Sequence, residues 1–137
     1  MPSPDERVRA VVLRELNSDE VGSCVVYLAA ETLPAGTTLT FPRATVEFPW
    51  AGRLAFVDLD PMANWAHACR YVCIEPDTDA TRSTDATLPP FGTDRPGKPH
   101  LEWRVLYKAP RVPAAVLAVP LEGNGAGAGT NSTSTPR

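Results

Sequence analysis

The spacing of apolar residues changes near residue 20, and this change limits the folds that the chain can adopt. Before it, Ser3 is placed to cap a helix, Pro4 fits the first helical position, and Glu6 completes a capping box. The residues that follow repeat at helical spacing, which predicts an amphipathic helix that ends near Asn17. Its single apolar stripe has to pack against a sheet to be buried. The stripe consists of Val8, Val11, Val12 and Leu16.

After residue 20 the apolar period is two, which indicates β-strands. Residues 53–59 are apolar on both faces, so we expect them to form a central strand. No second amphipathic helix is available for parallel crossovers, and 15 of the 137 residues are proline. The chain is therefore predicted to be all-β, mainly an antiparallel β-sandwich, with one short N-terminal amphipathic helix. The expected strands are 23–29, 37–41, 44–48, 53–59, 69–75, 101–108 and 114–119.

Two segments fall outside this strand pattern. Residues 76–100 are rich in Asp, Thr and Pro and are expected to form a long loop. Residues 122–137 contain mostly Gly, Ser, Thr, Asn and Ala, which cannot bury much apolar surface. We therefore expect a single β-sandwich-like domain over 1–121 and a disordered low-complexity tail over 122–137.

Charge and composition disfavour several classes of partner. The formal net charge of −3 and the scattered Lys and Arg residues argue against nucleic-acid binding. No apolar run approaches the roughly 20 residues that span a bilayer, and charged residues occupy the start of the chain. Membrane binding is therefore not expected, and the predicted location is cytoplasmic. An odd number of cysteines argues against a disulfide framework, so all three are expected to be reduced: Cys24, Cys69 and Cys73.

The segment 58–73 holds the greatest density of chemically capable side chains. One interpretation is nucleophilic catalysis, in which Cys69 attacks, His67 or the distant His100 acts as the base, and Asp60 or Asn64 orients the imidazole. Cysteine suits this role because a neighbouring imidazolium lowers the pKa of its thiol. On an extended strand, however, residues 67 and 69 are about 7 Å apart, too far for a direct hydrogen bond.

A second interpretation is a metal site. His67 and Cys69 carry good zinc ligands, and Asp58, Asp60 or Cys73 could complete the site. The spacing His-x-Cys-x3-Cys differs from the tight knuckles of structural zinc sites. No cofactor is therefore expected.

A third interpretation is structural. Asp60 before Pro61 resembles a helix N-cap, so residues 61–65 are expected to form one helical turn between two strands. Trp65 would pin this turn to the core, and Asn64 would satisfy backbone groups of the loop. In this interpretation His67, Arg70 and Tyr71 are partly exposed.

The sequence therefore leaves two classes of function. The first is a non-catalytic β-sandwich module that binds a protein or peptide partner, because aromatic and Arg side chains are typical of interfaces. Its expected contact residues are Asn64, Trp65, Arg70 and Tyr71. The alternative is a small Cys/His hydrolase or metal-binding enzyme centred on His67 and Cys69.

Overall fold

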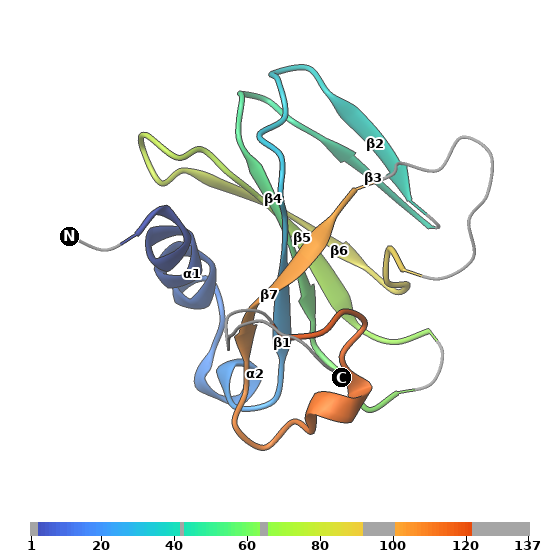
Figure 1. Cartoon of the computed structure of the whole chain (residues 1–137). Coiled ribbons are helices and arrows are strands. Elements are labelled where there is room, and N and C mark those ends of the chain that lie inside the picture. The colour runs from blue at the N-terminus through green and yellow to red at the C-terminus, as the bar shows by residue number, and fades with distance from the viewer. Residues whose placement is uncertain (1–2, 42, 64–65, 92–100, 122–137) are drawn as a thin grey trace, which may run out of the picture.

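The structure, a computed structural model, describes residues 3–41, 43–63, 66–91 and 101–121. The expected tail, 122–137, lies outside these residues, as do Asn64, Trp65 and His100. Strands dominate the described residues, and the fold is the all-β, sandwich-like fold that the sequence predicts (Figure 1). The elements in chain order are α1 (Pro4–Arg14), α2 (Ser18–Val21), β1 (Val25–Ala29), β2 (Thr38–Phe41), β3 (Ala44–Glu47), β4 (Arg53–Asp58), β5 (Cys69–Ile74), β6 (Thr81–Ala86), β7 (Trp103–Lys108) and the 3-10 helix η1 (Ala114–Val116).

Five strands form one antiparallel sheet in the order β6-β5-β4-β1-β7, so β4 is its middle strand. This position confirms the prediction for residues 53–59, because a strand that is apolar on both faces has to be covered on both. The register aligns Asp58 of β4 with Cys69 of β5, and Arg53 with Ile74. Directly opposed residues of antiparallel strands share a face of the sheet, so these two pairs fix which side chains meet.

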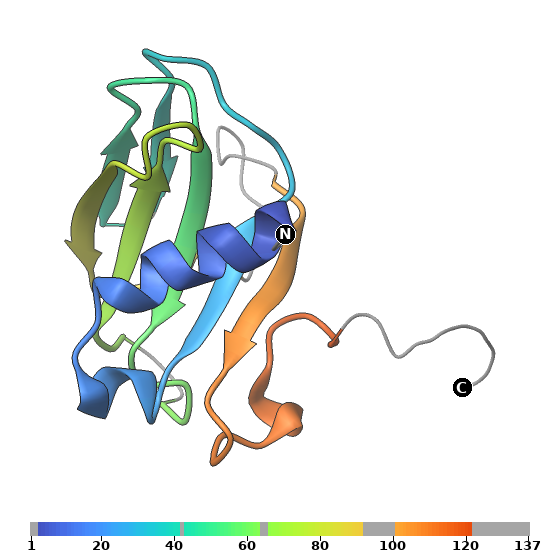
Figure 2. The same ribbon diagram turned by 90° about the vertical axis from the view of Figure 1, so that its left-hand side faces the viewer.

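Helix α1 covers one face of the sheet (Figure 2). It begins as predicted, with the reciprocal capping box between Ser3 and Glu6. Ion pairs hold its first two turns on the strands, one from Asp5 to Arg104 of β7 and one from Arg7 to Asp79 after β5. The apolar stripe of the helix is buried, as expected, on alternate residues of the three middle strands, which include Val26, Leu28, Ala55, Val57 and Val72.

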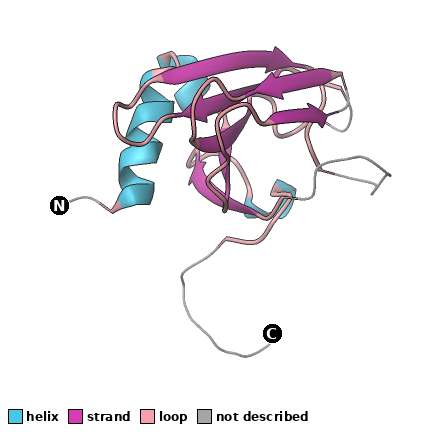
Figure 3. Ribbon diagram, turned by 90° about the horizontal axis from the view of Figure 1, so that it is seen from above, coloured by secondary structure: helices cyan, strands magenta, loops and turns pink. Residues whose placement is uncertain are grey.

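The hairpin β2–β3 and a C-terminal segment cover the opposite face. Phe41 and Val46 of the hairpin join a core with Tyr27, Phe56 and Tyr71 of the large sheet. Residues 109–121 return across this face, where the backbone N–H of Ala118 donates to the hydroxyl of Tyr27. Seen from above, α1 lies beside the strands rather than between them (Figure 3). The large sheet therefore has one helical and one mainly β cover.

Two of the expected elements are wrong, and the N-terminal helical region differs in detail from the prediction. Residues 81–86 are not loop but strand β6, which pairs with β5 over six consecutive residues. Residues 114–119 do not form a strand, because they lie between Pro113 and Pro120 and begin with η1. A short second helix, α2, follows α1, with a capping box between Asn17 and Glu20. Helix α1 ends at Arg14, three residues before its expected end.

The helices of the described residues are all too short or too polar to cross a membrane.

Candidate functional site

His67 and Asp58 meet at one end of the large sheet. The imidazole Nε2 lies 2.9 Å from Asp58 Oδ1, and the two side chains are only 8% and 12% exposed. Asp58 is the last residue of β4, and the turn that follows brings the chain back so that Leu59 N donates to Ala68 O. The His67 backbone N–H donates to Thr87 O, which fixes the histidine beside the end of β6. The position of Asp58 at the end of β4 and these two backbone hydrogen bonds thus bring His67 and Asp58 together.

Asp58, not Asp60, is the acid that contacts the histidine, so the orienting role expected for Asp60 is wrong. Asp60 is exposed, and its backbone N–H donates to Asp58 Oδ1 over 3.0 Å. Burial raises the pKa of the Asp58 carboxyl above its ordinary value, although His67 and the Asp60 N–H act in the opposite direction. The expected helical turn is also absent from its described part, because Asp60–Ala63 forms a single hydrogen-bonded turn. Asp58 therefore has two roles: it accepts the Asp60 N–H that closes the loop, and it holds the His67 side chain in place.

Cys69 lies opposite Asp58 but is packed in the core rather than presented to solvent. It is 2% exposed among the residues of the β-covered face. Burial, with smaller contributions from the charges of Asp58 and Asp85, raises the pKa of its thiol to about 12. A cysteine nucleophile needs the opposite environment, a positive one that favours the thiolate. The surroundings of Cys69 are those of a structural thiol.

Cys69 is therefore expected to react very slowly with iodoacetamide at neutral pH. A pKa near 12 instead of the ordinary 8.5 lowers the thiolate fraction by roughly three orders of magnitude. Burial of the sulfur adds a steric barrier. Alkylation can be followed residue by residue by mass spectrometry of digested protein, with the urea-unfolded chain as the fully reactive reference.

The control for this prediction is His67→Ala, which should leave the rate at Cys69 nearly unchanged. Fast alkylation in the folded protein that disappears in His67→Ala would instead establish a histidine-activated nucleophile.

The metal interpretation gains no support from this geometry. Within the described ranges, no three His, Cys, Asp or Glu side chains gather as a metal ion would need. The proposed set of Asp58, His67 and Cys69 supplies one close pair, Asp58 and His67.

The two expected interface residues that the structure describes, Arg70 and Tyr71, both have partners within the fold. Tyr71 is fully buried, so the prediction that it is partly exposed is wrong; its ring stacks on Phe41. Arg70 is partly exposed, as expected, but its guanidinium pairs with Asp85 and Glu20. Asn64 and Trp65 lie outside the described residues. The residues that the sequence suggested as an interface thus do not form one surface in the described structure.

The outer strand β7 is a more accessible candidate surface. Each of its six residues is partly exposed, although Trp103, Val105, Leu106 and Tyr107 are apolar or aromatic. Within the described part of the chain, β7 has one neighbouring strand, β1. The sequence predicted a half-buried strand here, but it could not show that the strand lies at the edge of the sheet.

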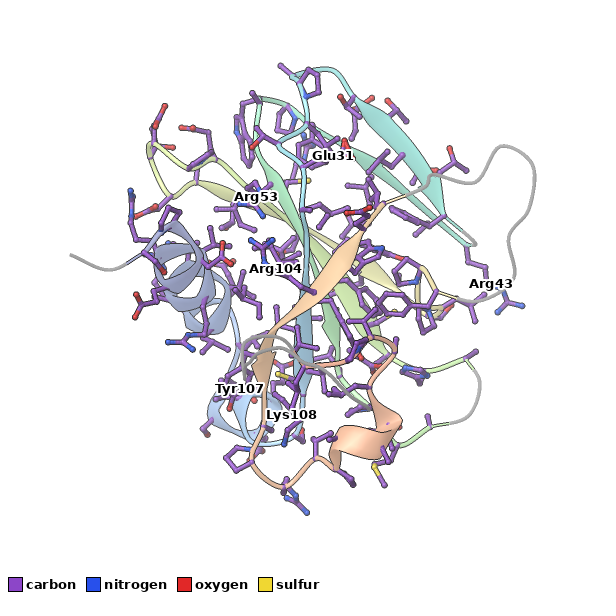
Figure 4. All side chains as sticks on the ribbon, in the orientation of Figure 1. Glu31, Arg43, Arg53, Arg104, Tyr107 and Lys108 are labelled. Carbon is purple, nitrogen blue, oxygen red and sulfur yellow. The ribbon has the colours of Figure 1, made fainter. Side chains whose placement is uncertain are left out.

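Sequence reasoning also missed Arg53. This residue begins the middle strand β4, and its side chain lies on the α1 side of the sheet together with Arg104 (Figure 4). The available signal was a charged residue at the start of an otherwise apolar central strand.

Comparison of the chain with models of known protein families, with curated proteins and with solved structures gave no match in any of the three.

Proposed function

We propose that this protein binds an extended peptide segment of a partner protein, which adds as a strand along the edge of β7 that faces away from β1. The observation that carries this proposal is the outer position of a strand whose apolar side chains are only partly covered. Strand addition gains backbone hydrogen bonds from the edge and specificity from alternate side chains. Three free cysteines fit a reducing location such as the cytoplasm.

The direction of the backbone groups along β7 follows from its pairing with β1. Ala30 N donates to Glu102 O, so the backbone groups of Glu102 point toward β1. Because this direction alternates along an antiparallel strand, the N–H and C=O of Trp103 and Val105 point away from the sheet. The side chains of these two residues lie partly exposed on the β-covered face. A peptide strand would meet two outward backbone sites and a half-covered apolar surface at the same place.

A bulge limits the length of this edge. Val105 is paired with Tyr27 and Tyr107 with Val26, which leaves Leu106 out of register. Bulges interrupt edge pairing and protect a sheet from long edge-to-edge association. The regular part of this outer edge is therefore short, which favours a short peptide strand over the edge of a second copy of this chain. The partner segment should carry apolar residues at alternate positions, beside Trp103 and Val105.

The test uses Val105→Pro. Proline at this position removes an outward N–H without removing a bond to β1, a substitution that edge strands tolerate. Peptides are first selected from a random displayed library on the wild-type protein, and their affinity is measured by calorimetry. Val105→Pro is expected to lower the affinity for the selected peptide by at least about tenfold. One backbone hydrogen bond is lost, and the peptide group that made it is left unsatisfied.

The matched control is Ser83→Pro on β6, at the opposite edge of the same sheet. Glu75 N donates to Ala80 O, so the same alternation points the Ser83 N–H outward. This variant should keep the wild-type affinity. In the wild-type protein, hydrogen exchange at Trp103 and Val105 should slow when the peptide binds, a result that does not depend on either variant folding. Protection confined to other amides, or dimerisation through β7 in place of peptide binding, would contradict the proposal.

A further inference from the structure

A cavity of about 230 Å³ lies under the first turns of α1, and we call it the helix pocket. Its apolar walls are Pro4 and Val8 of the helix, Ile74 at the end of β5, and Pro76. The pocket is smaller than the usual sites for drug-sized molecules, which suits a ligand of a few heavy atoms. Three charged residues line the same space, Arg7, Arg53 and Asp79.

Arg53 has an incomplete set of partners. Its Nη2 donates to Ala29 O over 2.9 Å, but its Nε is buried and has no hydrogen-bond partner among the described residues. The Nε is closed off from the pocket, so a ligand there would meet the guanidinium at its terminal nitrogens. The side chain of Ile74, directly opposite on β5, gives it no polar contact.

The acids near Arg53 are paired with other arginines. Asp5 accepts two bonds from Arg104, and Asp79 lies 3.0 Å from Arg7. Arg53 has no carboxylate within ion-pair distance in the described structure. Burial and the positive charge of Arg104 lower the pKa of its guanidinium, while Asp5 acts in the opposite direction. An anion in the helix pocket, bound at the terminal nitrogens of Arg53, would offset this repulsion.

We propose that the helix pocket binds the carboxylate of a small organic acid through Arg53, with the short hydrocarbon part against Pro4, Val8, Ile74 and Pro76. Guanidinium groups match the two oxygens of a carboxylate through parallel N–H donors. The apolar walls distinguish such a ligand from inorganic phosphate, which has no hydrocarbon part to bury. This site lies on the α1 side of the sheet and does not depend on peptide binding at β7.

The test is a titration of the full chain with acetate and butyrate at constant ionic strength, followed by the Nε–H signals of arginine in 15N NMR. One signal, assigned by its absence from Arg53→Gln, should shift and saturate. Butyrate should bind about tenfold more tightly than acetate, because two more methylene groups are buried. Butyramide, which has a similar shape and no charge, should not shift the signal, and inorganic phosphate should bind more weakly than butyrate.

Two further variants separate binding from folding. Thr32 is an exposed residue of the pocket rim, so Thr32→Trp should narrow the helix pocket and abolish butyrate binding while the protein stays folded. Arg82→Gln removes an exposed arginine on β6 and should leave the affinity unchanged. The proposal is overturned if no acid gives a saturable shift, if butyramide or phosphate binds as well as butyrate, or if Thr32→Trp still binds it.

Discussion

Replacing Phe56 with alanine is expected to lower the free energy of unfolding by about 3–5 kcal/mol. Phe56 lies on the middle strand and is completely buried. Its ring centroid is 5.2 Å from that of Tyr71, 5.6 Å from Phe91 and 6.0 Å from Tyr27, so its removal leaves a cavity bordered by rigid rings. Urea denaturation followed by circular dichroism measures this change.

Met62→Ala provides the comparison for Phe56→Ala. Met62 is 60% exposed in the turn after β4, so its truncation should change the stability by no more than about 0.5 kcal/mol. Equal losses for the two variants would mean that the aromatic residues do not pack as described.

Gly52→Ala is expected to cost about 3 kcal/mol, the upper end of the usual range for overpacking. A Cβ at this position would come within 2.2 Å of the carbonyl oxygen of Ile74 and 3.2 Å of the Trp50 ring. The first obstacle is backbone of the neighbouring strand, which cannot rotate away as a side chain can. The strands β4 and β5 must separate at this end, and thermal and urea denaturation should both detect the loss.

Gly22→Ala is the matched glycine control. Its φ of −77° is ordinary for alanine, and the nearest atom to an added Cβ would be 3.4 Å away. This variant should be neutral or slightly stabilising, because alanine restricts the unfolded chain. If Gly52→Ala were equally well tolerated, the close approach of β4 to β5 at Gly52 would be refuted.

The elements that the sequence predicted well are those with a strong apolar pattern. The capping box at Ser3 and the stripe through Val12 identified α1, and the apolar run at 53–59 identified the middle strand. Strand β6 has the sequence Thr-Arg-Ser-Thr-Asp-Ala, which has no apolar alternation because it lies at an edge. Its pairing with β5 is a tertiary contact, which the residue pattern within β6 alone does not predict. The apolar residues of 114–119 were misinterpreted because they pack on the core from an irregular segment.

The candidate sites were harder to predict because they depend on contacts across strands. The sequence placed an acid near His67, but whether Asp58 or Asp60 reaches it depends on the turn between them. The buried Nε of Arg53 depends on how α1 covers β4, which strand pattern alone does not specify. Burial of Tyr71 likewise follows from the position of the β2–β3 hairpin.

The order of the strands also determines when the core can be completed during synthesis. Strand β1 is buried along its whole length, yet its two neighbours, β4 and β7, are made later, and β7 is the last strand of the described chain. Because N-terminal segments leave the ribosome first, β1 emerges as an apolar strand without either partner. It remains open on one side until Lys108 has been added opposite Val25. A nascent chain of this protein therefore carries unpaired apolar surface from the synthesis of β1 until that of β7, which is the kind of surface that chaperones bind.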